Sequence, residues 1–409
     1  YSANSPQEML DILRNPQNGM QEVLDAVGVT LENKIKKRET DRNRTEINEL
    51  IKDTENGRRI ETTDRSLREE SRQEIKGTER GRNDRSVHGD HVSDKNGSGR
   101  VSEPSGSEQP VVTQNRNNFL YGNRHLELPA GEIGKLKGNI EAIRTLKELE
   151  ESGEMATPEQ KEKLLKFVGW GGLAESLNDT EYREWKRYQD ITYWNGEQGN
   201  TPWGKKYGSH YEALRPLLTD EEFGSAQAST LSSHYTPETV IRNMWSALEY
   251  LGFKGGKILE PAMGVGNIIG FMPEKISRRS RISGYELDSI PGRIAKQLYP
   301  DANIKIAGYE TEFHPNTKDA IVTNVPFGQI APIDPALDKT LRNKLKGAYN
   351  LHNYFIVKGL LELKPGGVGV FITSSATMDG RNSKAREYIS GLEVDLIGAI
   401  RLPNNTFKA

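Results

Sequence analysis

One short segment combines residue types that can hold a planar amine for reaction. Within Asp319–Gly328 an apolar strand ends at Asn324, and Val325, Pro326 and Phe327 follow. The Asn324 side-chain oxygen and the Val325 main-chain carbonyl can accept the two hydrogens of an exocyclic amine, which leaves the nitrogen lone pair directed at an electrophile. Pro326 stiffens the turn, and Phe327 offers a face on which a base can stack. The segment favours amino methylation, although a Pro-terminated strand without function has the same local pattern.

A glycine-containing turn at an earlier strand end predicts the cofactor site. The segment Ile258–Asn267 runs from a strand through this turn into a helix, and its glycines let the backbone approach a ligand closely. Glu260 at the strand end favours an amino-acid-bearing ligand such as S-adenosylmethionine over a pyrophosphate, whose charge it would repel. A dinucleotide site and an ordinary tight turn remain the alternatives. The expected cofactor-binding residues of this turn are Glu260, Pro261, Ala262, Gly264 and Gly266.

Two acidic residues at later strand ends complete the expected nucleoside site. Glu286 follows the glycine turn by about 20 residues, the spacing at which a carboxylate accepts hydrogen bonds from ribose hydroxyls. The neighbouring Asp288 reads instead as a helix N-cap. Glu310, after the third strand, is expected to bind the adenine amine of the cofactor, with Glu312 as its competitor.

Short apolar strands alternate with helical stretches around these residues, which predicts an α/β fold with a mostly parallel, doubly wound sheet. Such sheets bind ligands outside the carboxyl ends of their strands, where each of these polar segments lies. The expected strands are Lys257–Leu259, Arg281–Tyr285, Asn303–Ile306, Ala320–Thr323, Gly367–Thr373 and Leu396–Ile400.

The residues before the sheet divide into an arm and a helical subdomain. Charged and small residues without apolar periodicity predict a disordered or extended arm, preceded by short helices at Glu8–Leu13 and Gln21–Val27. Further along, apolar spacing predicts a helix over Ile133–Glu151, and Thr157 is an expected N-cap for a helix through Leu164 to Val168. The loop Gly169–Gly172 that follows either packs as a tight corner or faces a ligand.

Composition excludes several classes of protein. The hydrophobic share of 34% is low for 409 residues, which agrees with an arm that lacks a core. A net charge of −2 excludes only a uniformly basic nucleic-acid binder. The absence of cysteine excludes disulfides, thiolate metal sites and cysteine nucleophiles. No apolar run is long enough to span a bilayer, so we expect a cytoplasmic protein without membrane contact.

The order of these segments resembles that of N6-adenine-specific DNA methyltransferases, in which an Asp/Asn-Pro-Pro-Tyr/Phe tetrad is catalytic. Val168–Gly172, Asn324–Gly328 and Gly398–Pro403 are similar to segments of large methylase-helicase proteins of phages and conjugative elements, over roughly Asn118–Ala409. One departure is Val325, which stands where most of these enzymes have the first Pro. Because only the carbonyl of that residue takes part in the mechanism, the resemblance still implies activity.

The resemblance implies a Rossmann-like S-adenosylmethionine-dependent methyltransferase sheet, preceded by a helical N-terminal subdomain. It also implies that Tyr235, Thr236 and Pro237 contact the cofactor, and that a helicase domain lies downstream in the full-length chain. We therefore expect three parts: a charged arm over residues 1–115, a helical subdomain over 116–228, and a core over 229–409 that is cut short at its C-terminal end.

The expected activity is methylation of adenine N6 in DNA, of the restriction-modification kind, by direct transfer to a flipped base without metal or covalent intermediate. Lys339–Lys346 follows the reactive turn and either contacts the DNA backbone or forms a solvated loop, whereas His352 and Tyr354 are expected to pack. One alternative is a non-catalytic DNA-binding or antirestriction module that keeps the fold. Another is methylation of RNA or of a protein glutamine amide.

Overall fold

The computed structural model describes residues 117–193, 197–230, 236–328, 332–337, 350–403 and 406–407. Several predictions lie outside the described residues. They concern the arm over residues 1–115 with its helices Glu8–Leu13 and Gln21–Val27, the residue Tyr235, and the segment Lys339–Lys346.

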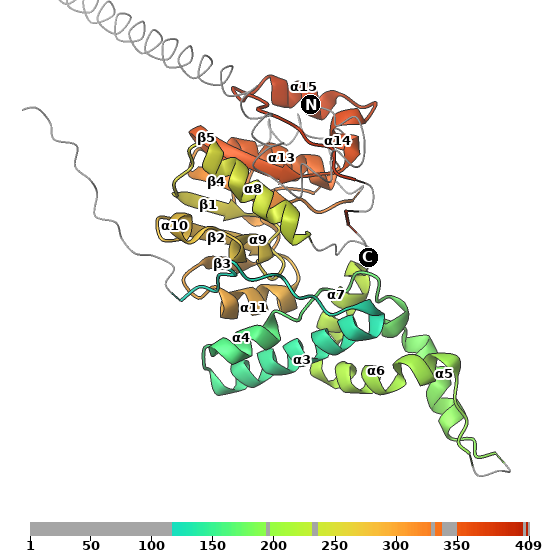
Figure 1. Cartoon of the computed structure of the whole chain (residues 1–409). Coiled ribbons are helices and arrows are strands. Elements are labelled where there is room, and N and C mark those ends of the chain that lie inside the picture. The colour runs from blue at the N-terminus through green and yellow to red at the C-terminus, as the bar shows by residue number, and fades with distance from the viewer. Residues whose placement is uncertain are drawn as a thin grey trace, which may run out of the picture. The chain divides into compact units, whose positions relative to one another are not determined.

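Five parallel strands form one sheet in the order β3-β2-β1-β4-β5 (Figure 1). The chain starts at the central strand, builds one side of the sheet through β2 and β3, and then returns to the other side of β1 with β4. The direction of strand addition therefore reverses between β1 and β4, which confirms the predicted Rossmann-like architecture. The strands are β1 (Lys257–Glu260), β2 (Arg281–Glu286), β3 (Asn303–Ile306), β4 (Lys318–Asn324) and β5 (Leu363–Ile372).

Five of the six strands expected from the sequence are confirmed, but the sixth, Leu396–Ile400, is wrong. This segment has no strand partner among the described residues. Its apolar side chains Leu396 and Ile400 are exposed. A strand is stable only when its backbone groups pair with a neighbour, and an apolar sequence alone does not supply that neighbour.

The two faces of the sheet pack against different helices because successive strand residues point in opposite directions. Ile258 and Val322 face one hydrophobic cluster, which includes side chains of α8 and α11. Leu259 and Ile321 face the other, which is built around α13. The helices of this part are α8 (Glu238–Tyr250), α9 (Asn267–Gly270), α10 (Glu274–Ser277), α11 (Ser289–Leu298), the 3-10 turn η5 (Tyr309–Thr311), α13 (Leu351–Glu362), α14 (Ser375–Asp379) and α15 (Lys384–Ser390).

A helical subdomain precedes the sheet, as the apolar periodicity predicts. Its elements are α3 (Gly131–Ser152), α4 (Pro158–Leu164), η2 (Glu175–Leu177), α5 (Asp179–Gln189), the π-helical η3 (Gly204–Gly208), α6 (Ser209–Leu214), η4 (Arg215–Leu217) and α7 (Asp220–Ser229). Thr157 caps α4 in a capping box with Gln160, as expected, but the helix ends at Leu164 rather than continuing to Val168. None of the described helices is both long and apolar enough to cross a bilayer.

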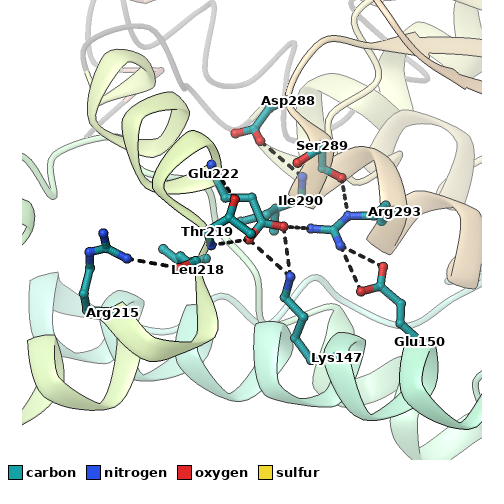
Figure 2. A network of polar contacts seen from close by, with 10 residues as sticks. All are labelled: Lys147, Glu150, Arg215, Leu218, Thr219, Glu222, Asp288, Ser289, Ile290 and Arg293. Atoms are coloured by element: carbon teal, nitrogen blue, oxygen red, sulfur yellow. Dashed lines mark hydrogen bonds and ion pairs between the residues drawn. The ribbon is translucent and has the colours of Figure 1, made fainter.

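Figure 2 shows an ion-pair network that joins the helical subdomain to α11 of the sheet. Arg293 on α11 donates to both carboxylate oxygens of Glu150 at 2.9 Å and also contacts Glu222 on α7. Lys147 donates to the same Glu222 carboxylate at 2.9 and 3.2 Å. Glu222 is buried and pairs with two cationic side chains. The network therefore links the helical subdomain to the sheet through a buried charge rather than through surface ion pairs alone.

The loop Gly169–Gly172 packs as a tight corner, the first of its two interpretations. Trp170 is fully buried and lies beside the Asp288 carboxylate. The buried Asn139 clamps the start of the loop: its amide donates to the Gly169 carbonyl at 2.7 Å and accepts from the Val168 amide at 2.8 Å. The second bond removes the Val168 N–H from the helical pattern, which explains why α4 does not reach this residue.

Replacing Asn139 with alanine is expected to destabilise the protein by about 2–4 kcal/mol. The change leaves the Gly169 carbonyl and the Val168 amide buried without partners, and each unsatisfied group costs roughly 1–3 kcal/mol. Urea unfolding would measure the loss, with Asn303→Ala as a matched control because Asn303 is exposed at the start of β3. Equal midpoints for the two variants would contradict the proposed clamp.

Candidate active site

Two turns leave the sheet at neighbouring strand ends. The glycine turn, Glu260–Gly266, follows β1, and the asparagine turn, Asn324–Phe327, follows β4. The two strands pair directly, with Ile258 opposite Ala320 and Leu259 opposite Ile321. Adjacent strands lie about 4.8 Å apart, so both turns begin at the same edge of the sheet. They flank the point where strand addition reverses, which is where open α/β sheets bind ligands.

The glycine turn needs glycine at two positions. Gly264 and Gly266 have φ angles of 55° and 85°, in the left-handed region that side chains disfavour. At Gly266 a Cβ would also lie 2.4 Å from Cε2 of the buried Tyr299. Glu286 at the end of β2 holds the turn, because its carboxylate accepts from the Gly264 amide at 2.6 Å and from the Asp288 amide at 2.9 Å. The candidate cofactor-binding residues that follow β1 and end β2 are therefore in direct contact.

Asp288 is the N-cap of α11, as its structural interpretation predicts. Its side chain accepts from the Ile290 amide at 3.2 Å and caps α11. Glu286 keeps additional acceptor capacity on both oxygens and remains the candidate for ribose hydroxyls. Burial raises the pKa of Glu286 to about 7, against the lowering effect of the backbone hydrogen bonds that it accepts.

Glu260 is a buried carboxylate with an unsatisfied oxygen. Its side chain is 1% exposed, and its Oε2 atom has no hydrogen-bond partner among the described residues. Burial raises the pKa of Glu260 well above 4.5, and the nearby Glu286 raises it further. An isolated buried charge is costly, so this position suits a cationic group that arrives with a ligand. Pro261, Ala262 and Gly264 surround it on the same turn, half-buried or buried.

Asn324, on the neighbouring strand, also has a buried side-chain oxygen without a hydrogen-bond partner among the described residues. Its Nδ2 donates to Oγ1 of the buried Thr236 at 3.1 Å, whereas its Oδ1 is buried and unpartnered within the described ranges. In this arrangement the atom without a partner is the oxygen, which is the acceptor that an amine requires. The bond also brings Thr236 and the asparagine turn together, and Pro237, next in the chain, begins α8 as its N-cap.

The remaining residues of the asparagine turn are held by β5 and α13. The Val325 amide donates to the Ile372 carbonyl at 3.1 Å, and the Val325 side chain is buried. Pro326 and Phe327 are half-buried, and the Phe327 ring centroid lies 6.4 Å from that of His352 on α13. His352 is buried, as its packing interpretation requires, but neither ring nitrogen has a partner in the described part of the chain. Burial lowers the pKa of His352.

The structure distinguishes Glu310 from its competitor Glu312. Glu312 contacts Lys305, pairs with His314 at 2.9 Å, and accepts from the Tyr285 hydroxyl at 3.1 Å. These hydrogen bonds lower the pKa of Glu312 to about 2. Glu310, in η5, does not take part in this group of bonds, and it interacts electrostatically with Tyr354 and Lys358. Glu310 therefore stays the candidate for the adenine amine of the cofactor.

One further candidate at this edge was not singled out from the sequence. Leu287, between Glu286 and Asp288, is 77% exposed. An exposed apolar side chain beside the ribose candidate can contact a flat nucleoside base. In the sequence, Leu287 is recognisable as an apolar residue between two acidic residues at a strand end, a position where burial in the core is not expected.

One protein family and one named protein are similar in sequence to parts of this chain. Residues 242–394 match the family described as Eco57I restriction-modification methylase. Defense against restriction protein B of Escherichia phage P1 is 29% identical over 187 residues, covering 44% of this chain and 8% of that protein, so the chain spans only a small part of this relative.

Two solved structures are similar to this chain at a lower sequence identity. A protein from Listeria monocytogenes described as a class I S-adenosylmethionine-dependent methyltransferase is 15% identical, with a TM-score of 0.31, over 63% of this chain and 79% of that one. The methyltransferase subunit of a type I restriction-modification system from Streptococcus thermophilus is also 15% identical, with a TM-score of 0.29, over 57% and 55%.

The family match covers both turns, Glu286 and Glu310, whereas Thr236 and Pro237 precede it. The segment is a methylase domain of the restriction-modification type, and its cofactor is S-adenosylmethionine.

Proposed function

Because this segment is a methylase domain of the restriction-modification type, we propose that the protein methylates N6 of adenine in DNA, with the asparagine turn as its catalytic residues. The observation that carries the proposal is the Asn324 amide, whose nitrogen is occupied by Thr236 while its oxygen is buried and unpartnered within the described residues. An oriented, unsatisfied acceptor at this edge is suited to an exocyclic amine.

Each residue of the asparagine turn has a role in holding the target base. The Asn324 side-chain oxygen and the Val325 carbonyl accept the two N6 hydrogens, so that the nitrogen lone pair points toward the glycine turn. Phe327 stacks on the base, and its ring is supported by His352. Asn324 does not need to act as a base, because the proton that N6 loses after bond formation can pass to water. Positioning carries most of the rate enhancement.

Acidic residues at or after the ends of β1, β2 and β3 fit the cofactor. The unsatisfied Glu260 oxygen is suited to its ammonium group, the Glu286 carboxylate to its ribose, and Glu310 to its adenine amine. Tyr235 remains a proposed contact. When bound, S-adenosylmethionine supplies an electrophilic methyl group on its sulfonium. Adenine in a duplex cannot reach such a site, so extrusion of the base precedes transfer.

Transfer of a labelled methyl group from S-adenosylmethionine tests the substrate. We expect label in unmethylated plasmid DNA, recovered after nuclease digestion as N6-methyladenine. N4-methylcytosine as the labelled product would reject the adenine assignment, and label in RNA or protein but not in DNA would reject the DNA assignment.

A second candidate follows from the relative of Escherichia phage P1, whose name describes defence against restriction. In this alternative the domain binds DNA and protects it without transferring a methyl group. The labelling experiment separates the two, because protection of DNA from cleavage without incorporation of label supports the non-catalytic module.

A further inference from the structure

Within residues 332–337, the described part of the loop after the asparagine turn, one large apolar side chain is exposed. Ile333 is 83% exposed, more than any other large hydrophobic residue in the described part of the chain. It follows Phe327 by six residues, so even an extended chain limits their separation to roughly 20 Å. A lone exposed isoleucine is common on protein surfaces. What sets Ile333 apart is how firmly its neighbours are held.

The next residue, Asp334, is a buried anchor. Its Oδ1 accepts from the amides of Ala336 and Leu337 at 2.8 and 3.2 Å, which closes a tight turn. Its Oδ2 accepts from the Tyr354 hydroxyl at 2.5 Å and from the Lys358 ammonium at 2.7 Å. Asp334 is 2% exposed, so this carboxylate directly beside an exposed isoleucine lies inside the protein.

Lys358 connects this anchor to the cofactor side of the sheet. It is fully buried on α13 and also donates to the Tyr309 carbonyl of η5 at 2.6 Å. Burial lowers the pKa of Lys358, and the Asp334 carboxylate opposes that effect. A buried ion pair with further hydrogen bonds resists separation, because removing either partner leaves an uncompensated charge. The loop is therefore stiff at Asp334.

The asparagine turn and this loop share their support. Val325 and Leu337 belong to one hydrophobic cluster, which also contains Tyr354 and against which Phe327 packs. Helix α13 contacts both segments, through His352 on the Phe327 side and through Tyr354 on the Asp334 side. The residue next to Ile333, Asp334, is thus bonded to the same helix that supports the proposed target-base site.

We propose that Ile333 is a wedge that enters the base stack of duplex DNA and fills the space left by the extruded adenine, an inference that rests on the proposed function. Proteins that unstack DNA insert apolar side chains such as isoleucine between base steps. Extrusion of a paired base has a cost that single-stranded DNA largely avoids. A wedge must also withstand the stacking that it disrupts, and the Asp334 anchor supplies that stiffness.

The test compares duplex plasmid DNA with the same DNA after heat denaturation. Ile333→Ser is expected to lower labelled methyl transfer to the duplex about tenfold more than transfer to the denatured strands, because only the duplex requires extrusion against pairing. Ile333→Leu should restore most of the duplex rate. Leu396→Ser is the matched control, since Leu396 is 69% exposed and lies outside the site.

Permanganate oxidation of thymines left unpaired in the duplex provides a readout that needs no methyl transfer. Wild type should increase it, and Ile333→Ser should not. Equal losses on both DNA forms, or equal permanganate reactivity for the two proteins, would overturn the wedge. Absence of label with wild type on both DNA forms would instead reject the proposed function, and the permanganate measurement would still decide the role of Ile333.

Discussion

Asn324→Ala is expected to lower methyl transfer to DNA by at least about 100-fold, the loss typical when a preorganised hydrogen-bonding group is removed from a reacting centre. The Asn324 oxygen is the proposed acceptor of one N6 hydrogen, and no other side-chain acceptor in the asparagine turn can replace it. The measurement is incorporation of labelled methyl groups into unmethylated plasmid DNA.

Asn324→Asp is the informative partner variant, because it keeps an acceptor oxygen and loses only the amide donor. The Thr236 hydroxyl, which accepts from Asn324, can donate to an aspartate instead. We expect this variant to retain transfer within roughly tenfold of wild type, since the geometry is preserved. Asn303→Ala, on the exposed start of β3, controls for a general effect of losing an asparagine.

Cofactor binding by the Asn324 variants separates catalysis from folding. S-adenosylmethionine should raise the melting temperature of Asn324→Ala about as much as that of wild type, because the proposed cofactor contacts lie outside the asparagine turn. If Asn324→Ala transfers methyl groups at the wild-type rate, the asparagine turn is not the catalytic turn. If wild type binds the cofactor and DNA but transfers nothing, the non-catalytic module is supported.

Glu260→Gln is expected to weaken binding of S-adenosylmethionine about 10- to 100-fold while stabilising the protein without cofactor. The first effect is the loss of a charge-assisted hydrogen bond to the ammonium group, worth about 1.5–3 kcal/mol. The second arises because a neutral amide removes the charge that burial and Glu286 make unfavourable. Calorimetric titration of the cofactor at pH 8 measures the first effect, and thermal unfolding measures the second.

The pH dependence of stability gives this prediction a definite sign. The folded-state pKa of Glu260 is raised above 4.5, so between that pH and the raised pKa the folded protein binds more protons than the unfolded chain. Stability is therefore lost as pH rises through this window. Glu286, with its pKa raised to about 7, contributes a loss of the same sign between pH 4.5 and about 7.

Glu260→Gln removes the contribution of Glu260 and leaves that of Glu286, so the decline in melting temperature with rising pH should be shallower than in wild type. Glu393→Gln is the matched control, because Glu393 is exposed and distant in sequence from the site. Equal cofactor affinity in wild type and Glu260→Gln would rule out Glu260 as the partner of the ammonium group, whatever the effect on stability.

Val325 is the residue at which this chain departs from the tetrad of amino-methyltransferases. Its side chain is buried, and its amide donates to the Ile372 carbonyl, a bond that proline could not make. Valine at this position thus ties the asparagine turn to β5 through its amide, and its carbonyl is the proposed acceptor for the substrate amine. In this chain, a hydrogen bond takes over the stiffening that a first proline would supply.

The amino-acid sequence predicts those features of this protein that a single segment determines. Strands β1 to β4 were predicted to within two residues at each end, because each strand contains a short apolar run that is recognisable in the sequence. The Thr157 cap and the possible Asp288 cap were likewise visible, since an N-cap bonds to amides only two or three residues away. The order of the two turns along the chain was enough to suggest their chemistry.

Only the tertiary structure decided matters that depend on partners far apart in the chain. Leu396–Ile400 has the residues of a strand but no strand partner among the described residues, and Glu312 is bonded to Lys305. Which carboxylate oxygen of Glu260 and which amide atom of Asn324 lack a partner among the described residues depends on packing across many residues, as does the meeting of Asp334 with Lys358 inside the protein. Local backbone preferences act over a few residues and are written in the sequence, whereas satisfaction of buried polar groups depends on the whole fold.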